Sequence, residues 1–437
     1  MPLRNIPGGG KAKAHVFLDV EMEEVVRPAA GHELRAGWGS KVVITIGPSC
    51  QDVATLVRLL RTGVTCARVD LSWGTKEYHQ RSLRNLAEAM QQTRLLWSVW
   101  LDTTGREVVV RRPIEYDASG WPRQQDQRIT VEKDQVFKIT TDPTATASPS
   151  LLPVNYPGES LRPPAAGCPV LPSTPSPPFH EIVEVGQQLQ IGRYLSTGTE
   201  GMSLYADVVD VGEGEVTCVA LSSAVLDGLL TVMVCHTEDE EFRGDFGLPL
   251  LTEFDVDCIK SLGSQFEVDF VNLSYCNSVD DLYSARALLD SLGMAQTKII
   301  AKASGGIERK AAIRNFEAIA HVADGIMISR GNLGLDFEPE VMALLQKRIV
   351  SRCNQLGKPV HITRIVDTMA TDVANAVLDG VDGLLLGAET LRGEYPVETV
   401  ETVLKLAAAA EKHFDYHTHH EMLMGEAYEA SRLRQPA

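Results

Sequence analysis

The chain has 437 residues, of which 44% are hydrophobic and 23% are charged, the composition of a globular protein with room for two or three domains. Its formal net charge of −17 argues against binding to nucleic acid or to an anionic membrane, because both ligands select a basic surface. The eight cysteines form no CxxC pair and no apolar run resembles a signal peptide or a membrane span, so we expect reduced thiols and a cytoplasmic location.

Short apolar or β-branched runs, each followed by a helical pattern, begin after an N-terminal arm of residues 1–40. Eight such runs lie at 42–47, 65–70, 98–103, 269–275, 298–303, 325–329, 359–364 and 383–388. Strands that alternate with helices predict parallel strands joined by βαβ crossovers. Eight units predict a closed (β/α)8 barrel of the TIM type, an α/β fold, built from residues 41–105 and 245–437.

Residues 106–244 carry a different pattern, between the third and fourth barrel strands. The runs EVVVRR, RITVEK, QVFKITTD and LLTVMV are strand-like, and no long helical pattern separates them. We therefore expect a small all-β domain inserted after the third strand. Within it, residues 148–178 are rich in proline and serine and predict a mobile loop.

Several motifs resemble those of the pyruvate kinase family. VVITIGPSC, TCARVDLSWGTKEYH and WLDTTGREV are similar to the family segments TIGP, ARLNFSHG and LDTKGPEIR, and IIAKASGGIE, DGIMISRGNLGLD and DVANAVLDG follow in the family's order. The resemblance covers roughly residues 41–412 and itself implies a β domain after the third strand. Family members carry a further C-terminal α/β domain, and because few residues follow 412 we expect that domain to be absent.

The resemblance implies phosphoryl transfer from phosphoenolpyruvate to ADP, with Mg²⁺ and K⁺ as cofactors. Such catalysis depends on positioning and on cations that neutralise oxygen charge, at the C-terminal ends of the barrel strands. The implied catalytic residues are Arg68 for the phosphate, Lys302 for the transferred phosphate and enolate oxygen, and Thr363 for proton delivery. The implied substrate-binding residues are Arg68, Ser274, Lys302, Gly331 and Thr363.

A potassium-type site is implied at Ser72, Asp102 and Thr103, which match three family ligands. The fourth ligand, an asparagine in the family, is Asp70. Two interpretations of this change stay open. Asp70 and Asp102 could create a shifted metal site or bind the monovalent ion more strongly, or Asp70 could pair with a nearby lysine or arginine, as strand-end carboxylates commonly do.

Groups that the family reaction needs are missing. The two carboxylates that hold the divalent metal are replaced by Ser304 and Asn332, which are neutral, whereas magnesium prefers anionic oxygen. Each lost charge pair is worth about 4 kcal/mol at 4 Å near a surface. Thr104, Val109 and Trp73 also replace a lysine, an arginine and a histidine, and the loop before DVANAV is deleted.

These losses favour a catalytically impaired pseudoenzyme that binds a phosphorylated metabolite such as phosphoenolpyruvate, or a protein partner. It could form a homo-oligomer through the barrel or a hetero-oligomer with an active paralogue. Two alternatives stay open. One is a divergent, active pyruvate kinase of glycolysis with a relocated metal site that uses Asp70, Glu308 or Asp336. The other is a barrel enzyme with a different reaction that exploits Lys302 and Glu389.

Overall fold

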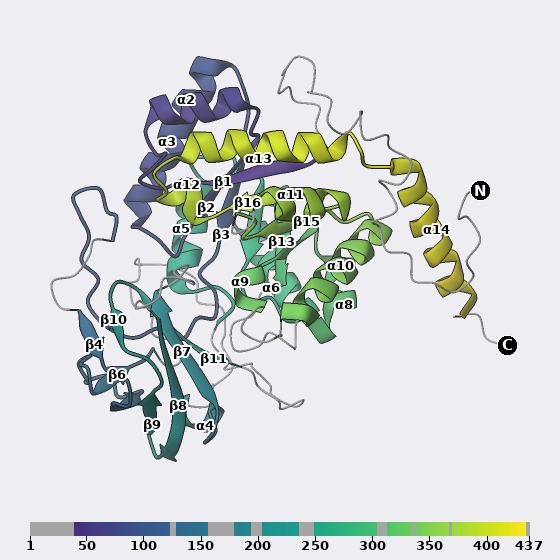
Figure 1. The fold of residues 1–437 in the computed structure, drawn as a ribbon. Helices are drawn as coiled ribbons and strands as arrows, with labels where there is room; N and C mark the ends of the chain where they lie inside the picture. The colour runs from purple at the N-terminus through teal and green to yellow at the C-terminus, as the bar shows by residue number, and fades with distance from the viewer. Residues whose placement is uncertain are drawn as a thin grey trace.

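Eight parallel strands close into a barrel in the computed structural model, which describes residues 39–122, 128–155, 179–193, 203–235, 249–303, 313–333, 337, 339–366 and 369–433 (Figure 1). The strands are β1 (Lys41–Thr45), β2 (Cys66–Asp70), β3 (Ser98–Asp102), β12 (Phe270–Leu273), β13 (Lys298–Ala303), β14 (Gly325–Ile328), β15 (Val360–Thr363) and β16 (Gly383–Leu386). The order around the barrel is β1-β16-β15-β14-β13-β12-β3-β2. The predicted (β/α)8 fold is therefore confirmed.

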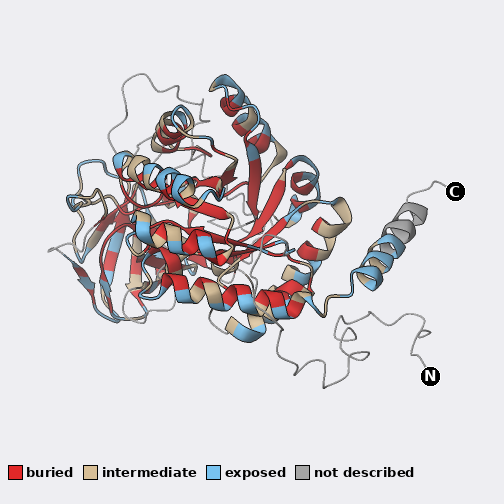
Figure 2. Cartoon of the chain, turned by 90° about the horizontal axis from the view of Figure 1, so that it is seen from above, coloured by how far each residue is buried: buried red, intermediate tan, exposed pale blue. Residues whose placement is uncertain are grey.

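Helices surround this barrel and turn their apolar faces toward it, except the last helix, which projects from the side of the barrel and has no buried residue among its described side chains (Figures 1 and 2). The larger ones are α2 (Val53–Thr62), α3 (Lys76–Thr93), α5 (Glu253–Gly263), α6 (Val279–Ser291), α8 (Phe316–Val322), α10 (Pro339–Leu356), α11 (Met369–Leu378), α13 (Pro396–Glu411) and α14 (Tyr416–Leu433). Short helices α9 (Arg330–Leu333) and α12 (Ala388–Leu391) follow β14 and β16. No helix among the described residues is long and apolar enough to span a membrane.

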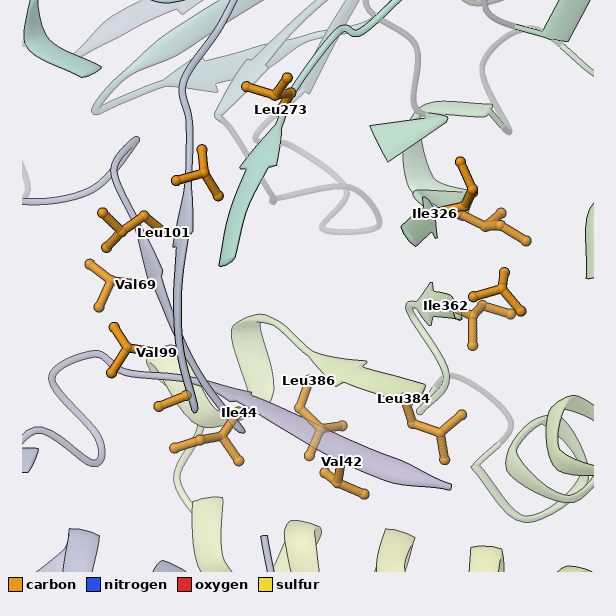
Figure 3. Packing of buried hydrophobic residues seen from close by; sticks show 14 of the residues in the cluster. Val42, Ile44, Val69, Val99, Leu101, Leu273, Ile326, Ile362, Leu384 and Leu386 are labelled. Carbon is orange, nitrogen blue, oxygen red and sulfur yellow. The ribbon is translucent and has the colours of Figure 1, made fainter. Parts of the chain in front are cut away.

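Successive residues of each barrel strand point to opposite sides, as the two-residue period of a strand requires. Val42 and Ile44 of β1, like Leu384 and Leu386 of β16, belong to the cluster that packs between the strands and the helices (Figure 3). The intervening residues fill the barrel interior; they are Val43, Cys66, Trp100, Ile300, Met327 and Leu385. This apolar interior makes the barrel a packed core rather than a channel.

An aromatic group crosses the barrel interior. The Trp100 ring on β3 contacts the His361 ring on β15 edge-on, with 4.8 Å between their centroids, and lies at the same distance from Phe270. Burial lowers the pKa of His361 to about 4, so the ring is neutral at physiological pH. These three side chains form a floor beneath the C-terminal mouth of the barrel.

The inserted domain is all-β around its own apolar core, apart from the short helix α4 (Phe179–Ile182). A six-stranded sheet has the order β11 (Leu230–Cys235), β7 (Gln188–Arg193), β8 (Ser203–Gly212), β9 (Glu215–Ala220), β5 (Val136–Thr140) and β6 (Leu151–Pro153). Strands β10 (Ala224–Leu226) and β4 (Ile129–Val131) form a separate pair. The exact limits of the arm, barrel and insert stay a prediction.

One part of the predicted Pro/Ser-rich loop is wrong. Within residues 148–178, strand β6 pairs in parallel with β5, and its Leu152 is fully buried in the core of the insert. The two leucines of β6 favour a strand although serine and proline surround them, because burial of Leu152 stabilises an edge strand, where proline is tolerated. Residues 156–178 of that loop, like residues 1–38 of the N-terminal arm, lie outside the described part of the chain.

We expect Gly383→Ala to destabilise the barrel, because a Cβ at this position would lie 2.1 Å from the His361 ring. The ring is held by Trp100, so overpacking should lower the free energy of unfolding by about 1–3 kcal/mol. Urea unfolding measures the loss. Gly212→Ala, whose added Cβ would meet no atom closer than 3.8 Å, is the control and should change stability little; equal effects of the two substitutions would contradict the packing argument.

Candidate active site

Charged and polar side chains replace the apolar ones where the barrel strands end. Thr45, Arg68, Asp70 and Asp102 continue the inward-facing rows of β1, β2 and β3, and Lys302 lies on β13. Because all parallel strands end on one side, these groups meet above the aromatic floor. They form the mouth cluster, which we define as Arg68, Asp70, Asp102 and Lys302.

Arg68 is the hub of the mouth cluster, with only 3% of its surface exposed. One terminal nitrogen donates to Asp70 Oδ2 at 2.9 Å, and the other donates to Thr45 Oγ1 at 3.2 Å. Its Nε and a terminal nitrogen both contact Asp102 Oδ2. The guanidinium is therefore bound by two carboxylates, and Asp70 is ion-paired as the second interpretation of its substitution expected.

Lys302 completes the cluster from the other side of β12 and is 5% exposed. Its Nζ donates to Asp102 Oδ1 at 2.9 Å and to Ser274 Oγ at 3.0 Å. Ser274 in turn donates from Oγ to the Thr103 carbonyl oxygen at 2.6 Å. These hydrogen bonds fix the ammonium group and join four of the predicted substrate and ion-binding residues: Lys302, Ser274, Asp102 and Thr103.

The mouth cluster carries two cations and two carboxylates, so its net charge is zero when all four groups are ionised. The Asp102 carboxyl has a lowered pKa: burial alone would raise it, but the charges of Arg68 and Lys302 and their hydrogen bonds outweigh that effect. Burial raises the pKa of Asp70, with the Asp102 charge adding to the effect against Arg68. A second carboxylate is thus held beside Arg68 at an electrostatic cost.

The four residues of the predicted potassium-type site lie together at the exits of β2 and β3, where Asp70 and Asp102 are register partners. Asp70 Oδ1 accepts from the Ser72 backbone N–H at 3.1 Å. Thr103 Oγ1 accepts from the Ser274 N–H at 3.0 Å and donates to the Asn272 carbonyl oxygen at 3.1 Å. The oxygen donors fit a monovalent ion in kind, and the assignment stays a prediction.

The predicted divalent-metal positions do not make a comparable donor set. Ser304 lies outside the described residues, and Asn332 falls in α9, where only its backbone is described. Within the described ranges, no group of three or more His, Cys, Asp or Glu side chains is arranged to hold a metal. The mouth carboxylates Asp70 and Asp102 are already bound to cations, so the described residues do not fit a divalent ion.

Thr363 and Gly331 belong to a second cluster on the β14 and β15 side of the mouth. Arg330 Nε donates to the Thr363 carbonyl oxygen at 2.9 Å, while its two terminal nitrogens bind the Asp372 carboxylate at 2.8 and 2.7 Å. The Arg364 side chain lies against Gly331, where a Cβ would meet its Cδ at 2.8 Å. Both predicted residues are therefore held in place by arginines.

Trp73, at the position of a family histidine, belongs to an aromatic stack beside β2. Its ring stacks on Trp121 with centroids 5.5 Å apart and planes 12° from parallel, and the Arg392 guanidinium lies 5.4 Å from the Trp73 centroid. Trp121 also contacts Tyr78 of α3. The stack ties the segment that leads into the inserted domain to the barrel mouth.

Two aspartates that hold the loop after β3 were not singled out from the sequence. Asp255 is the third residue of α5 and accepts from the backbone N–H groups of Thr104 and Gly105, at 2.8 and 3.2 Å. Asp281, in the same place on α6, binds Arg106 through both carboxylate oxygens, at 3.0 and 2.6 Å. The capping-box spacings TEFD and SVDD were the available signal.

Glu107, at the start of the inserted domain, is another residue that the sequence did not reveal. It is buried, and its Oε1 accepts a hydrogen bond from the Tyr275 hydroxyl at 2.8 Å. Its Oε2 has no hydrogen-bond partner among the described residues. Burial raises its pKa to about 8, and the nearby Asp70 charge adds to the rise. Glu107 is therefore a neutral carboxylic acid at physiological pH.

Comparisons with known proteins agree with this geometry. The model of the pyruvate kinase barrel domain matches residues 39–160 and 241–400. "Pyruvate kinase 2, cytosolic" of Oryza sativa subsp. indica is 38% identical over 387 residues, covering 86% of this chain and 66% of the relative. The pyruvate kinase of Dictyostelium discoideum is 31% identical over 384 residues, covering 85% and 66%. The chain thus spans less than two thirds of the length of these relatives.

A solved structure, "Cryptosporidium parvum pyruvate kinase in complex with ADP", superposes with a TM-score of 0.71 at 26% identity. The match covers 92% of this chain and 73% of that one.

We expect Glu107 to make stability fall as the pH rises. Between about pH 4.5 and 8 the folded chain keeps the Glu107 proton that the unfolded chain has lost. The folded state therefore binds one more proton, and the free energy of unfolding decreases by up to about 1.4 kcal/mol per pH unit in this range. Urea unfolding at pH 5, 6.5 and 8 measures this slope, which should be shallower in Glu107→Gln; equal slopes would show that Glu107 is ionised in the folded protein.

Proposed function

Because this chain belongs to the pyruvate kinase family, we propose that its barrel mouth binds a small phosphorylated ligand such as phosphoenolpyruvate but transfers the phosphoryl group to ADP very slowly or not at all. The observation that carries the proposal is the ion pair between Asp70 and Arg68. Arg68 and Lys302 are retained as cations at the mouth, which supports anion binding. Their charges are matched by Asp70 and Asp102, which supports weak catalysis.

The ligand phosphate has to compete with Asp70 for Arg68. By the resemblance an asparagine stands at this position in the family, which leaves one more uncompensated positive charge at the mouth. A charge at about 4 Å is worth about 4 kcal/mol near a protein surface. Phosphoryl transfer depends on such charges even more than ligand binding does, because negative charge is spread over the transferred oxygens in the transition state.

In this proposal the Lys302 ammonium group, which donates to Asp102 and Ser274 in the structure, contacts the ligand phosphate. Arg68 contributes a second, partly neutralised cation, and Gly331 and Thr363 line the opposite side. Ser304 and Asn332 replace the family's metal-holding carboxylates, so the proposed binding does not depend on a divalent ion. The other alternative, a barrel enzyme that catalyses a different reaction with Lys302 and Glu389, has no specific observation in its favour.

The remaining expectations follow the family. A potassium-type site formed by Asp70, Ser72, Asp102 and Thr103 would hold K⁺ near the phosphate, and Mg²⁺ binding is expected to be weak. ADP, which the Cryptosporidium parvum relative was solved with, is the nucleotide to test. We place the protein in the cytoplasm, as the name of the rice relative supports, and expect self-association through the barrel or association with an active paralogue.

Pyruvate formation from phosphoenolpyruvate and ADP tests the loss of catalysis, with excess Mg²⁺ or Mn²⁺ and K⁺. We expect no rate above that of the Lys302→Met variant, because the charges that stabilise the transferred phosphoryl group are compensated or lost. Turnover that disappears in Lys302→Met would contradict the proposal and favour the alternative, a divergent active pyruvate kinase with a relocated metal site.

Asp70→Asn tests the role of the ion pair in binding. The substitution frees one positive charge at Arg68, so phosphoenolpyruvate should bind about tenfold more tightly or better, measured by calorimetry or by the ligand-induced rise in Tm. Glu398→Gln, which removes an exposed acid paired with Arg58, is the control for net charge and should leave affinity unchanged. An unchanged affinity in Asp70→Asn would sink the competition between Asp70 and ligand.

A further inference from the structure

Asn272 is a buried amide in the mouth whose side-chain polar atoms make no hydrogen bond with the described residues. Its side chain is fully buried, and neither Oδ1 nor Nδ2 has a hydrogen-bond partner among the described residues. An unsatisfied buried amide destabilises a protein, and such groups are uncommon in folded chains. A specific reason is therefore needed for a polar residue at this place.

The position of Asn272 is fixed by the alternation of β12. Val271 and Leu273 belong to the cluster between strands and helices, and Phe270 packs against Trp100 in the interior. Asn272 accordingly points inward, one layer above the aromatic floor. It is the register partner of Asp102 on the neighbouring strand β3.

The ion pair of Asp102 and Lys302 spans Asn272. Strand β12 lies between β3 and β13 in the barrel order, and the Lys302 Nζ reaches across it to Asp102 Oδ1 at 2.9 Å. Inward-facing register partners have their side chains next to each other. The Asn272 amide is therefore next to the carboxylate that Lys302 holds.

We propose that Asn272 is a positioning residue whose amide donates to Asp102 when Lys302 turns from Asp102 to the phosphate of a bound ligand. This inference rests on the proposed function, in which Lys302 contacts the ligand. In the structure, the Lys302 Nζ donates to Asp102 Oδ1, and the Asn272 amide makes no hydrogen bond with the described residues. In the liganded state, Asp102 would lose a charged donor, and the Asn272 Nδ2 replaces it. The hydrogen bond from Asn272 lowers the free-energy cost of breaking the Lys302–Asp102 hydrogen bond, so Lys302 is free to contact the ligand.

This change of partner gives the polar Asn272 side chain a role, although its amide makes no hydrogen bond with the described residues. An apolar residue of the same shape would make the ligand-free protein more stable, because it removes an unsatisfied amide. It would also leave Asp102 one hydrogen bond short in the liganded state. The two effects have opposite signs, which separates this role from a merely structural one.

Asn272→Leu, of nearly the same shape, provides the test. We expect the ligand-free variant to unfold at a higher urea concentration than the wild type, and to bind phosphoenolpyruvate about tenfold more weakly or worse, the value of one hydrogen bond to a charged group. In a Lys302→Met background the same substitution should no longer affect binding, whereas its effect on stability should persist.

The other outcomes are distinguishable. If Asn272→Leu lowers stability and leaves phosphoenolpyruvate binding unchanged, the amide is satisfied by a buried water and its role is structural, which overturns the inference. If binding weakens equally in the presence and absence of Lys302, the coupling to Lys302 is wrong and the inference fails. If neither phosphoenolpyruvate nor inorganic phosphate binds the wild type, the proposed function itself is wrong, and the inference falls with it.

Discussion

The ion pairs among Arg68, Asp70, Asp102 and Lys302 are the constraint on which the mouth of this barrel depends. Two cations that are almost wholly buried need negative partners, because an unpaired charge in such a place costs several kcal/mol. Asp102 is ion-paired with both Arg68 and Lys302. Asp70 supplies the second negative charge, so the cluster is neutral. In the proposed function, the contact that stabilises Arg68 is also the contact with which the ligand phosphate competes.

The rest of the fold holds this cluster in place. Beneath it, the rings of Trp100, Phe270 and His361 pack against one another across the barrel interior. The ion pairs above them are buried, which strengthens their electrostatic attraction. Around it, Asp255 and Asp281 begin α5 and α6 and bind the loop after β3. Helix capping and site geometry are thus served by the same carboxylates, and a change in either helix start would reach the mouth.

Membership of the pyruvate kinase family sets the fold, but the charge balance of the mouth is a property of this chain. The carboxylate at position 70 offsets positive charge in the mouth, and the neutral residues at 304 and 332 stand where, by the resemblance, the family has carboxylates that hold its divalent metal. Asn272 adds a buried amide that makes no hydrogen bond with the described residues. The mouth is consistent with a protein that retains a binding function in which Lys302 changes partner.

The sequence by itself determined the barrel and the insert, because alternating strand and helix patterns are local signals. Arg68, Lys302 and Asp102 were predicted as site residues by the resemblance of their motifs to those of the pyruvate kinase family. The sequence left open whether Asp70 is ion-paired with a nearby cation. It also missed Glu107 and Asn272 and misread strand β6 as loop. Those points were decided by tertiary structure, because a pairing across strands, a burial that shifts a pKa and an edge strand in a proline-rich segment depend on residues far apart in the chain.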